Sequence, residues 1–287
     1  MKQTFISFVL WSTTIAAFSQ SDTSAPRKTE DRREDTIRVG GIIIIKEKND
    51  GQNPKKTSNT QGYHWSGRSG NGKFSTSWFI FDVGYSGYND RTDYGTQEAQ
   101  DFLRFQRGIP ASAGDYAIRG TRISNFNLWF FMQRMDLYKK VINLKYGFGM
   151  ETNNYYYKTP ISYVDGGKPY TFRDSVIFSK NKIAANYFTV PLMLHINTNP
   201  RARNGGFQMS FGVSAGYLFA ARQKQISDER GKVKNKSDFN LDNWKIAYVG
   251  ELGMGPILFY GSYSMTALHR YGLDQMPWNV GVRMNAW

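Results

Sequence analysis

Eight stretches of the chain alternate between apolar and polar residues with a period of two. They span residues 78–85, 125–133, 141–151, 185–196, 207–219, 243–252, 257–267 and 278–287. The fifth is the clearest, because apolar side chains at every second position from Phe207 to Phe219 face Gln208, Ser210, Gly212, Ser214 and Gly216. Successive side chains of a strand point to opposite faces, so this period predicts β-strands with one apolar and one polar face. Runs of about 9–11 residues are long enough to cross a bilayer as tilted strands.

The connections between these stretches differ in length in a regular order. The longer ones are residues 88–122, 153–181, 223–242 and, at intermediate length, 268–277; the short ones are 135–139, 197–205 and 253–256. Bacterial outer-membrane barrels have an even number of strands, short periplasmic turns and longer extracellular loops. The strands of a soluble sandwich or a lipocalin-type barrel also alternate between apolar and polar residues. In those folds, however, nothing requires the loops at one end to be longer than those at the other. We therefore predict an all-β fold, an eight-stranded antiparallel up-and-down transmembrane β-barrel over residues 78–287.

Two details of the strands are specific predictions. The second stretch places Phe126, Leu128, Phe130 and Met132 on the apolar face. Pro191 lies in the middle of the fourth stretch, where it removes a hydrogen-bond donor from the sheet and predicts a β-bulge.

The N-terminal residues have the features of an export signal. One lysine precedes the apolar run from Phe5 to Phe18, and small residues stand before Gln20. The run is shorter than the roughly 20 residues of a membrane-spanning helix, so residues 1–19 are predicted to be a signal peptide. Residues 20–77 are expected to form a flexible periplasmic leader with an isoleucine-rich strand and a polar linker. The predicted location is the outer membrane.

The isoleucine-rich strand follows Gly40 and Gly41 and consists of Ile42, Ile43, Ile44 and Ile45. It is too short to span the membrane, and a ninth strand would make the strand number odd. An unpaired apolar strand invites aggregation, so another element has to cover it. We predict a periplasmic docking strand that pairs with the barrel's lower rim, with its own leader, or with a periplasmic partner by strand addition.

Composition narrows the choice of partners. The chain has no cysteine, so disulfides and a lipid-modified cysteine are excluded. Its net charge of +14 would suit nucleic acid, but export makes that partner improbable, and we predict none. Anionic outer-membrane lipid and lipopolysaccharide are the exported alternative, and the solubility of exposed loops explains the charge equally well.

Charged residues on the polar strand faces are expected to point into the lumen. There are three acids and three bases: Asp82, Lys145, Glu151, Lys245, Glu251 and Arg283. The interior of an eight-stranded barrel is filled by its own side chains, and unpaired buried charges are costly. We therefore predict a paired internal network rather than a conduction path.

Aromatic residues near the strand ends suit the two membrane interfaces. Trp78 and Trp287 are placed at the periplasmic rim, and the outer rim is assigned Tyr85, Tyr155, Tyr217, Trp244 and Trp278. Cross-strand packing of aromatic residues in any β-protein is the alternative.

The loop at residues 222–238 is strongly basic and should project from the cell. Its cations are Arg222, Lys224, Arg230, Lys232, Lys234 and Lys236. The hypothesis is contact with lipopolysaccharide phosphates or an acidic partner, and the alternative is a solvated loop.

The sequence offers little for catalysis. Its three histidines are His64, His195 and His269, and the predicted topology places the last two at opposite rims. A serine–histidine hydrolase needs its base within about 3 Å of the nucleophile, and zinc sites need Cys/His spacings that are absent here. We predict no enzyme activity, no catalytic residues, no cofactor and no metal site.

Several segments together resemble one family: "DTIRVGGIIIIKE", "SWFIFDVGYSGYN", "GFGMETNNYYY", "YFTVPLMLHI", "FQMSFGVSAGYLF" and "KSDFNLDNWKIAYVGELGMGPILFYGSYSMTAL". In order and spacing they are similar to the PorT-like outer-membrane β-barrel family of the Bacteroidota, over most of the chain beyond the signal peptide. The resemblance implies an outer-membrane barrel, with some relatives tied to secretion or gliding machinery, and it supplies no catalytic residues.

The prediction that results is an integral outer-membrane barrel with a structural or interaction role, a closed lumen and long extracellular loops, within a larger envelope assembly. A small-solute porin is the alternative, and an outer-membrane lipid-modifying enzyme is the second. The expected partners are outer-membrane lipid and lipopolysaccharide, the barrel assembly machinery, and a periplasmic or envelope protein.

Overall fold

The computed structural model describes residues 35–39, 42–46, 73–104, 109–120, 122–200, 206–255 and 257–284, with backbone only for the first two ranges. The chain divides into two units, Met1–Gly62 and Tyr63–Trp287. In the first unit, β1 (Asp35–Val39) and β2 (Ile42–Lys46) pair antiparallel, with Ile37 opposite Ile44. The isoleucine-rich strand is thus paired with a segment of the leader. The predicted signal peptide lies outside the described residues.

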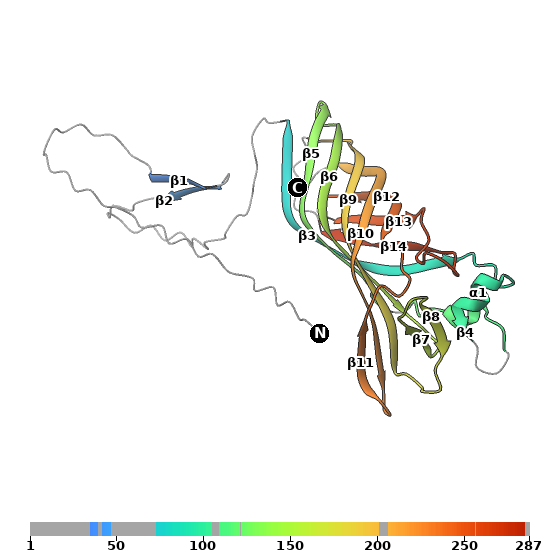
Figure 1. Ribbon diagram of the computed structural model, residues 1–287. Coiled ribbons are helices and arrows are strands. Elements are labelled where there is room, and N and C mark those ends of the chain that lie inside the picture. The colour runs from blue at the N-terminus through green and yellow to red at the C-terminus, as the bar shows by residue number, and fades with distance from the viewer. Residues whose placement is uncertain are drawn as a thin grey trace, which may run out of the picture. The chain divides into compact units, whose positions relative to one another are not determined.

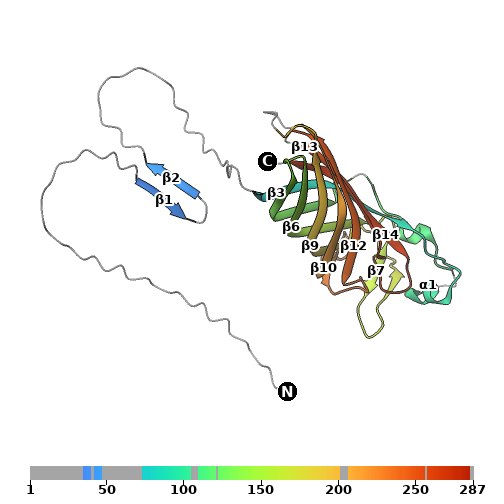
Figure 2. The ribbon, with the colours of Figure 1, turned by 90° about the horizontal axis from the view of Figure 1, so that it is seen from above.

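The second unit is a closed barrel of eight strands (Figures 1 and 2). They are β3 (Phe74–Asp90), β5 (Asn125–Tyr138), β6 (Ile142–Tyr156), β9 (Lys180–Asn197), β10 (Phe207–Ser227), β12 (Trp244–Met254), β13 (Ile257–Ser264) and β14 (Gln275–Met284). Each strand pairs antiparallel with the next one along the ring, and β14 pairs with β3 to close it. The predicted all-β, eight-stranded up-and-down barrel is confirmed.

The two ends of the barrel differ as the loop lengths predicted. At one end β5 and β6 are joined by a tight turn in which Lys139 and Lys140 have φ angles of 48° and 59°. Two successive left-handed residues form the kind of turn whose twist matches the flanking strands. The long connections at the other end carry further structure, which we call the cap: α1 (Gln97–Phe102), β4 (Leu103–Arg104), η1 (Ala113–Tyr116), β7 (Ile161–Val164) and β8 (Tyr170–Arg173).

The cap is built from short elements. The strands β4, β8 and β7 form a small sheet, and the side chain of Thr96 caps α1 by accepting a hydrogen bond from the Ala99 amide. Beside the cap, β10 continues past the barrel and pairs with β11 (Gly231–Lys236), so the predicted basic loop is a β-hairpin instead. Among the described residues, no helix has the length and hydrophobicity that a membrane crossing requires.

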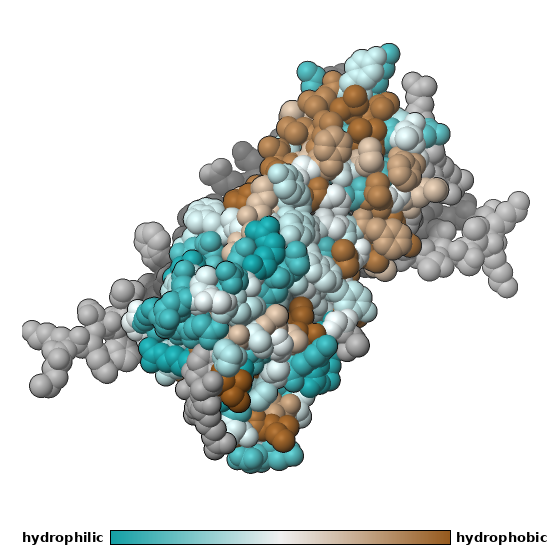
Figure 3. Space-filling view, turned by 90° about the vertical axis from the view of Figure 1, so that its right-hand side faces the viewer, coloured by the Kyte–Doolittle hydropathy of each residue, from teal (hydrophilic) through white to brown (hydrophobic). Residues whose placement is uncertain are grey.

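The barrel is apolar outside and polar inside. Phe81 is 60% exposed, whereas its neighbour Asp82 is only 1% exposed, and the other strands alternate in the same way. Large exposed side chains on the outer surface include Val83, Val190, Leu192, Phe211, Val213, Tyr248 and Phe259. On the face shown in Figure 3, hydrophobic residues gather over one part of the molecule and hydrophilic residues over the other. An apolar band of this size is what a barrel presents to lipid.

Three predictions about side-chain direction or strand geometry were wrong. Met132 is buried rather than lipid-facing, because a bulge between Trp129 and Phe131 shifts the alternation of β5. Tyr155 is not on the outer rim, because it lies on the same face of β6 as Glu151 and is 1% exposed. Pro191 produces no bulge. On both sides of the proline β9 keeps the same register with β6 and with β10, and only two pairs with β6 are missing there.

Candidate functional site: the filled lumen and the cap

One cluster of charges fills the barrel near the short turns. Arg283 on β14 binds Asp82 on β3 with two hydrogen bonds, from Nε to Oδ1 at 2.6 Å and from Nη2 to Oδ2 at 2.7 Å. Its Nη1 also contacts Glu251 on β12, which accepts a further bond from the Nζ of Lys145 at 2.5 Å. All four side chains are buried, so each charge is compensated where water is excluded.

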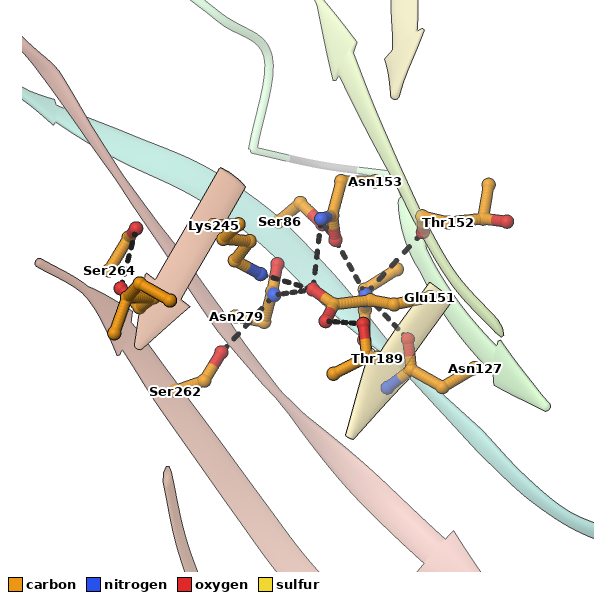
Figure 4. Close-up of polar contacts among 12 residues, drawn as sticks. Ser86, Asn127, Glu151, Thr152, Asn153, Thr189, Lys245, Ser262, Ser264 and Asn279 are labelled. Carbon is orange, nitrogen blue, oxygen red and sulfur yellow. Dashed lines mark hydrogen bonds and ion pairs between the residues drawn. The ribbon is translucent and has the colours of Figure 1, made fainter. Parts of the chain in front are cut away.

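A second cluster surrounds Glu151 on β6 (Figure 4). Its carboxylate forms an ion pair with Lys245 on β12. It also accepts hydrogen bonds from the side-chain amides of Asn153 at 2.9 Å and Asn279 at 2.8 Å, and from the hydroxyl of Thr189 at 3.4 Å. Four strands therefore converge on one buried carboxylate.

Asparagines join the two clusters. Asn127 donates to Asp82 at 3.1 Å, Asn125 donates to both Asn127 at 3.1 Å and Asn153 at 2.7 Å, and Asn153 reaches Glu151. All six residues that the sequence assigned to the lumen thus belong to one hydrogen-bonded network. The cavity among them is about 30 Å³, roughly the space of one water molecule.

A serine and a histidine meet at the edge of the first cluster, a contact that the sequence reasoning missed. The hydroxyl of Ser210 donates to Glu251 at 3.0 Å, so the Nδ1–H of His195 has to be the donor to Ser210, also at 3.0 Å. The Nε2 of His195 then accepts from Arg134 at 3.3 Å. In this arrangement the histidine does not act as a base toward the serine. His195 and Ser210 lie opposite each other on the polar faces of β9 and β10, which a short connection joins, so the contact could have been predicted from the alternation.

The cap end of the barrel is filled by apolar side chains. Its core joins cap residues Phe102, Leu103, Tyr116, Ile161 and Tyr163 with inward-facing residues of the barrel wall, Tyr155, Ile183, Tyr187 and Leu218, and with Phe239, Leu241, Leu268 and Leu273 of the connections. Buried bonds fix the arrangement, among them those from Asn181 and Gln223 to the carbonyl of Ile161, at 2.7 and 2.9 Å. The lumen is therefore polar in one half, and in the other half it is packed like the hydrophobic core of a soluble protein.

This combination of an outer apolar band, a filled polar lumen and long loops at one end agrees with the comparison with known families. Residues 126–270, just over half of the chain, match the family model described as outer membrane protein beta-barrel domain. The chain belongs to this family. It is an integral protein of the outer membrane. Because such barrels carry their longer loops on the extracellular side, we expect the cap end to face outward. A search of curated proteins found no match.

The outer-membrane barrel carries most of its predicted interface aromatics on the outer surface. Trp78, Tyr85, Tyr217 and Trp244 are exposed, and the rings of Tyr217 and Trp244 lie 5.1 Å apart, edge to face. Trp278 is half-buried, and Trp287 lies outside the described residues. Tyr155 belongs to the cap core instead, where its ring is 5.5 Å from that of Tyr88.

The six cations of the basic hairpin separate into two groups. Arg230 forms a two-pronged ion pair with Asp174, at 2.7 and 3.0 Å, which ties the hairpin to the end of β8. The other five, Arg222, Lys224, Lys232, Lys234 and Lys236, take part in none of the ion pairs formed by the described residues.

A buried histidine sits in the cap. His269 is 2% exposed, its ring stacks on Tyr163, and its Nε2 lies 3.2 Å from the Tyr163 hydroxyl. Its Nδ1 has no hydrogen-bond partner among the described residues. Burial lowers the pKa of His269 to about 3, only partly opposed by the charge of Asp90, so the ring is neutral.

This histidine predicts acid sensitivity of the cap. When the cap is open, the histidine has its ordinary pKa of about 6.5. Below that pH the open cap therefore binds a proton that the closed cap does not. The contribution of the neutral histidine to the stability of the closed cap is complete above that pH. It falls by about 2 kcal/mol between pH 7 and pH 5. Amide hydrogen exchange in the cap, corrected for intrinsic rate, should therefore accelerate at pH 5.

The control for this prediction is His269→Phe, which fills the same space without a titrating group. Its cap should exchange at nearly the same corrected rate at both pH values. Protonation of Asp115 does not add to the effect at pH 5. Burial raises the pKa of Asp115, but hydrogen bonds from Arg173 and Ser112 outweigh it and hold the pKa below its usual value. An equal acceleration in both proteins would assign the acid sensitivity to another group.

Proposed function

We propose that this protein is a closed outer-membrane barrel with a structural or interaction role in the cell envelope, and that it is not an enzyme. The observation that carries the proposal is the filled interior, in which the charged network occupies one half and the cap core the other. A porin requires a continuous aqueous path, and the cavity among the lumen charges is about 30 Å³. The direction of the hydrogen bonds from His195 to Ser210 to Glu251 argues against a hydrolytic enzyme.

The interaction role is assigned to the extracellular cap. Three isoleucines lie exposed near it, and Ile177, at 86%, is more exposed than the side chains of the lipid-facing band. Ile109 and Ile123 are 57% and 49% exposed. Apolar side chains left in water at the end of a folded element suit a protein partner. The resemblance to the PorT-like group supports a place in a larger envelope assembly, with lipopolysaccharide and the barrel assembly machinery as further partners.

Site-specific photo-crosslinking in cells tests the interaction role. A photoreactive amino acid at Ile177 should give a discrete protein adduct, and one at Val213 on the lipid-facing band should give none. Both variants must first show the mobility shift between folded and heat-unfolded barrel. Identical adduct patterns at the two positions, or no adduct at Ile109, Ile123 and Ile177, would contradict a partner at the cap.

A further inference from the structure

Seven cations lie on the outer side of the sheet just beyond the lipid-facing band; six are at least partly exposed, and Lys182 is buried. We call this the basic face: Lys180 and Lys182 on β9, Arg222 and Lys224 on β10, and Lys232, Lys234 and Lys236 on β11. The strand register places Lys182, Lys224 and Lys234 in one row across the three strands. Arg222 likewise lies opposite Lys236. Directly paired residues point to the same side of a sheet, and neighbouring strands are only about 4.8 Å apart.

This arrangement carries uncompensated repulsion. Like charges that lie opposite each other destabilise a sheet, and none of the ion pairs formed by the described residues involves these seven side chains. Of the acids nearby, Asp174 binds Arg230 and Asp238 binds Arg270, whereas Asp228 and Glu229 lie in the hairpin turn and form none of these ion pairs with the seven cations. Partial burial, together with the charges of Lys180 and Lys232, lowers the pKa of Lys224, as expected for crowded ammonium groups.

An aromatic ring extends the basic face toward β6. The ammonium groups of Lys180 and Lys182 lie 5.6 and 5.3 Å from the ring centre of Tyr156, and the guanidinium of Arg122 lies 5.7 Å from it. Lys182 also donates to the side-chain oxygen of Asn154 at 2.5 Å. These contacts hold the cations in place without neutralising them.

The height of the basic face relative to the membrane indicates its ligand. On β10 the last exposed aromatic residue of the lipid-facing band is Phe219, whose ring stacks on Phe188 with the centres 4.2 Å apart. Arg222 follows three residues later, on the same outer side because of the bulge between Leu218 and Ala220. Three residues of a strand span about 10 Å, so the cations begin at the depth of the lipid headgroups.

We propose that the basic face binds the phosphate groups of a phosphorylated glycolipid in the outer leaflet. Rows of ammonium groups above an apolar wall match a ligand that has phosphates at the headgroup and acyl chains below it. The proposal is independent of whether the lumen is closed, since a conducting barrel would present the same outer surface.

Native mass spectrometry of the full-length protein tests this proposal. The protein is incubated in detergent with diphosphoryl lipid A or with its dephosphorylated form, and retained lipid is measured. The unmodified protein should retain the diphosphoryl form at least tenfold better. A variant with Lys224, Lys232, Lys234 and Lys236 replaced by glutamine should lose at least tenfold of that retention.

The matched control replaces Lys73, Lys139, Lys140 and Lys168 by glutamine. It changes the net charge by the same amount at positions away from the basic face. This control should retain lipid as the unmodified protein does, and both variants must show the folded-barrel mobility shift. Equal retention of the two lipids, or equal losses in the two variants, would overturn the proposal. Complete competition by 10 mM inorganic phosphate would also overturn it in favour of a free-phosphate site.

Discussion

Replacing Arg283 with methionine is expected to destabilise the barrel by about 3–5 kcal/mol. Arg283 is the cation that both Asp82 and Glu251 contact, and all three side chains are buried. Methionine has a similar length but no charge, so Asp82 would lose its ion pair and Glu251 would keep Lys145 as its remaining cationic partner. An unpaired buried carboxylate is far more costly than a lost surface pair, so the effect should be large.

The free energy of unfolding in urea, followed by tryptophan fluorescence and gel mobility, measures this loss. The matched control is Arg270→Met, because Arg270 pairs with Asp238 at 3.0 Å with both side chains substantially exposed. Exposed pairs contribute about 0–1 kcal/mol. Adding Asp82→Asn to Arg283→Met should recover part of the loss, since it removes the stranded charge. A loss below about 1 kcal/mol in Arg283→Met would contradict the pairing.

Replacing Gly84 with valine is the other substitution with a large expected effect, about 3 kcal/mol. Gly84 on β3 lies opposite Gly281 on β14, at the seam where the barrel closes. A Cβ atom on Gly84 would lie 2.2 Å from the carbonyl oxygen of Val280 and 2.7 Å from the hydroxyl of Tyr260. The carbonyl belongs to the backbone and cannot rotate away, and the Tyr260 hydroxyl is held by its bond to Asn125.

The same urea titration measures this effect, with Gly167→Val as the control. Nothing lies within 4 Å of the position of a Cβ on Gly167, in the connection between β7 and β8. The control should unfold within about 0.5 kcal/mol of the unmodified protein. If Gly84→Val were equally stable, β3 and β14 would have to be further apart than the structure places them.

Much of the barrel could be predicted from the sequence, because period-two alternation is a local signal. The inward direction of Lys145 and Glu251 follows from their positions in alternating strands, and their contact follows from two inward faces in a narrow barrel. Met132 was assigned to the wrong face because the bulge in β5 depends on how Trp129 and Phe131 pair with another strand. Tyr155 was assigned to the rim by its distance along β6, although continued alternation from Glu151 would have turned it inward.

The structure of the cap could not be predicted from local alternation. Its core joins residues as distant in sequence as Phe102, Tyr163 and Leu268, and its short elements have no period long enough to detect. The sequence predicts a loop where β10 and β11 form a hairpin, because the alternating residues there are lysine and polar rather than apolar. Long-range packing, not local pattern, decides these regions.

Single-channel recording in a planar bilayer tests most directly whether the barrel is closed. The full-length protein, reconstituted after its folded state is verified by gel mobility, should give no stable conductance steps at neutral pH, because the ion network and the cap core fill the lumen. Large, stable steps that scale with the amount of folded protein would contradict the closed barrel.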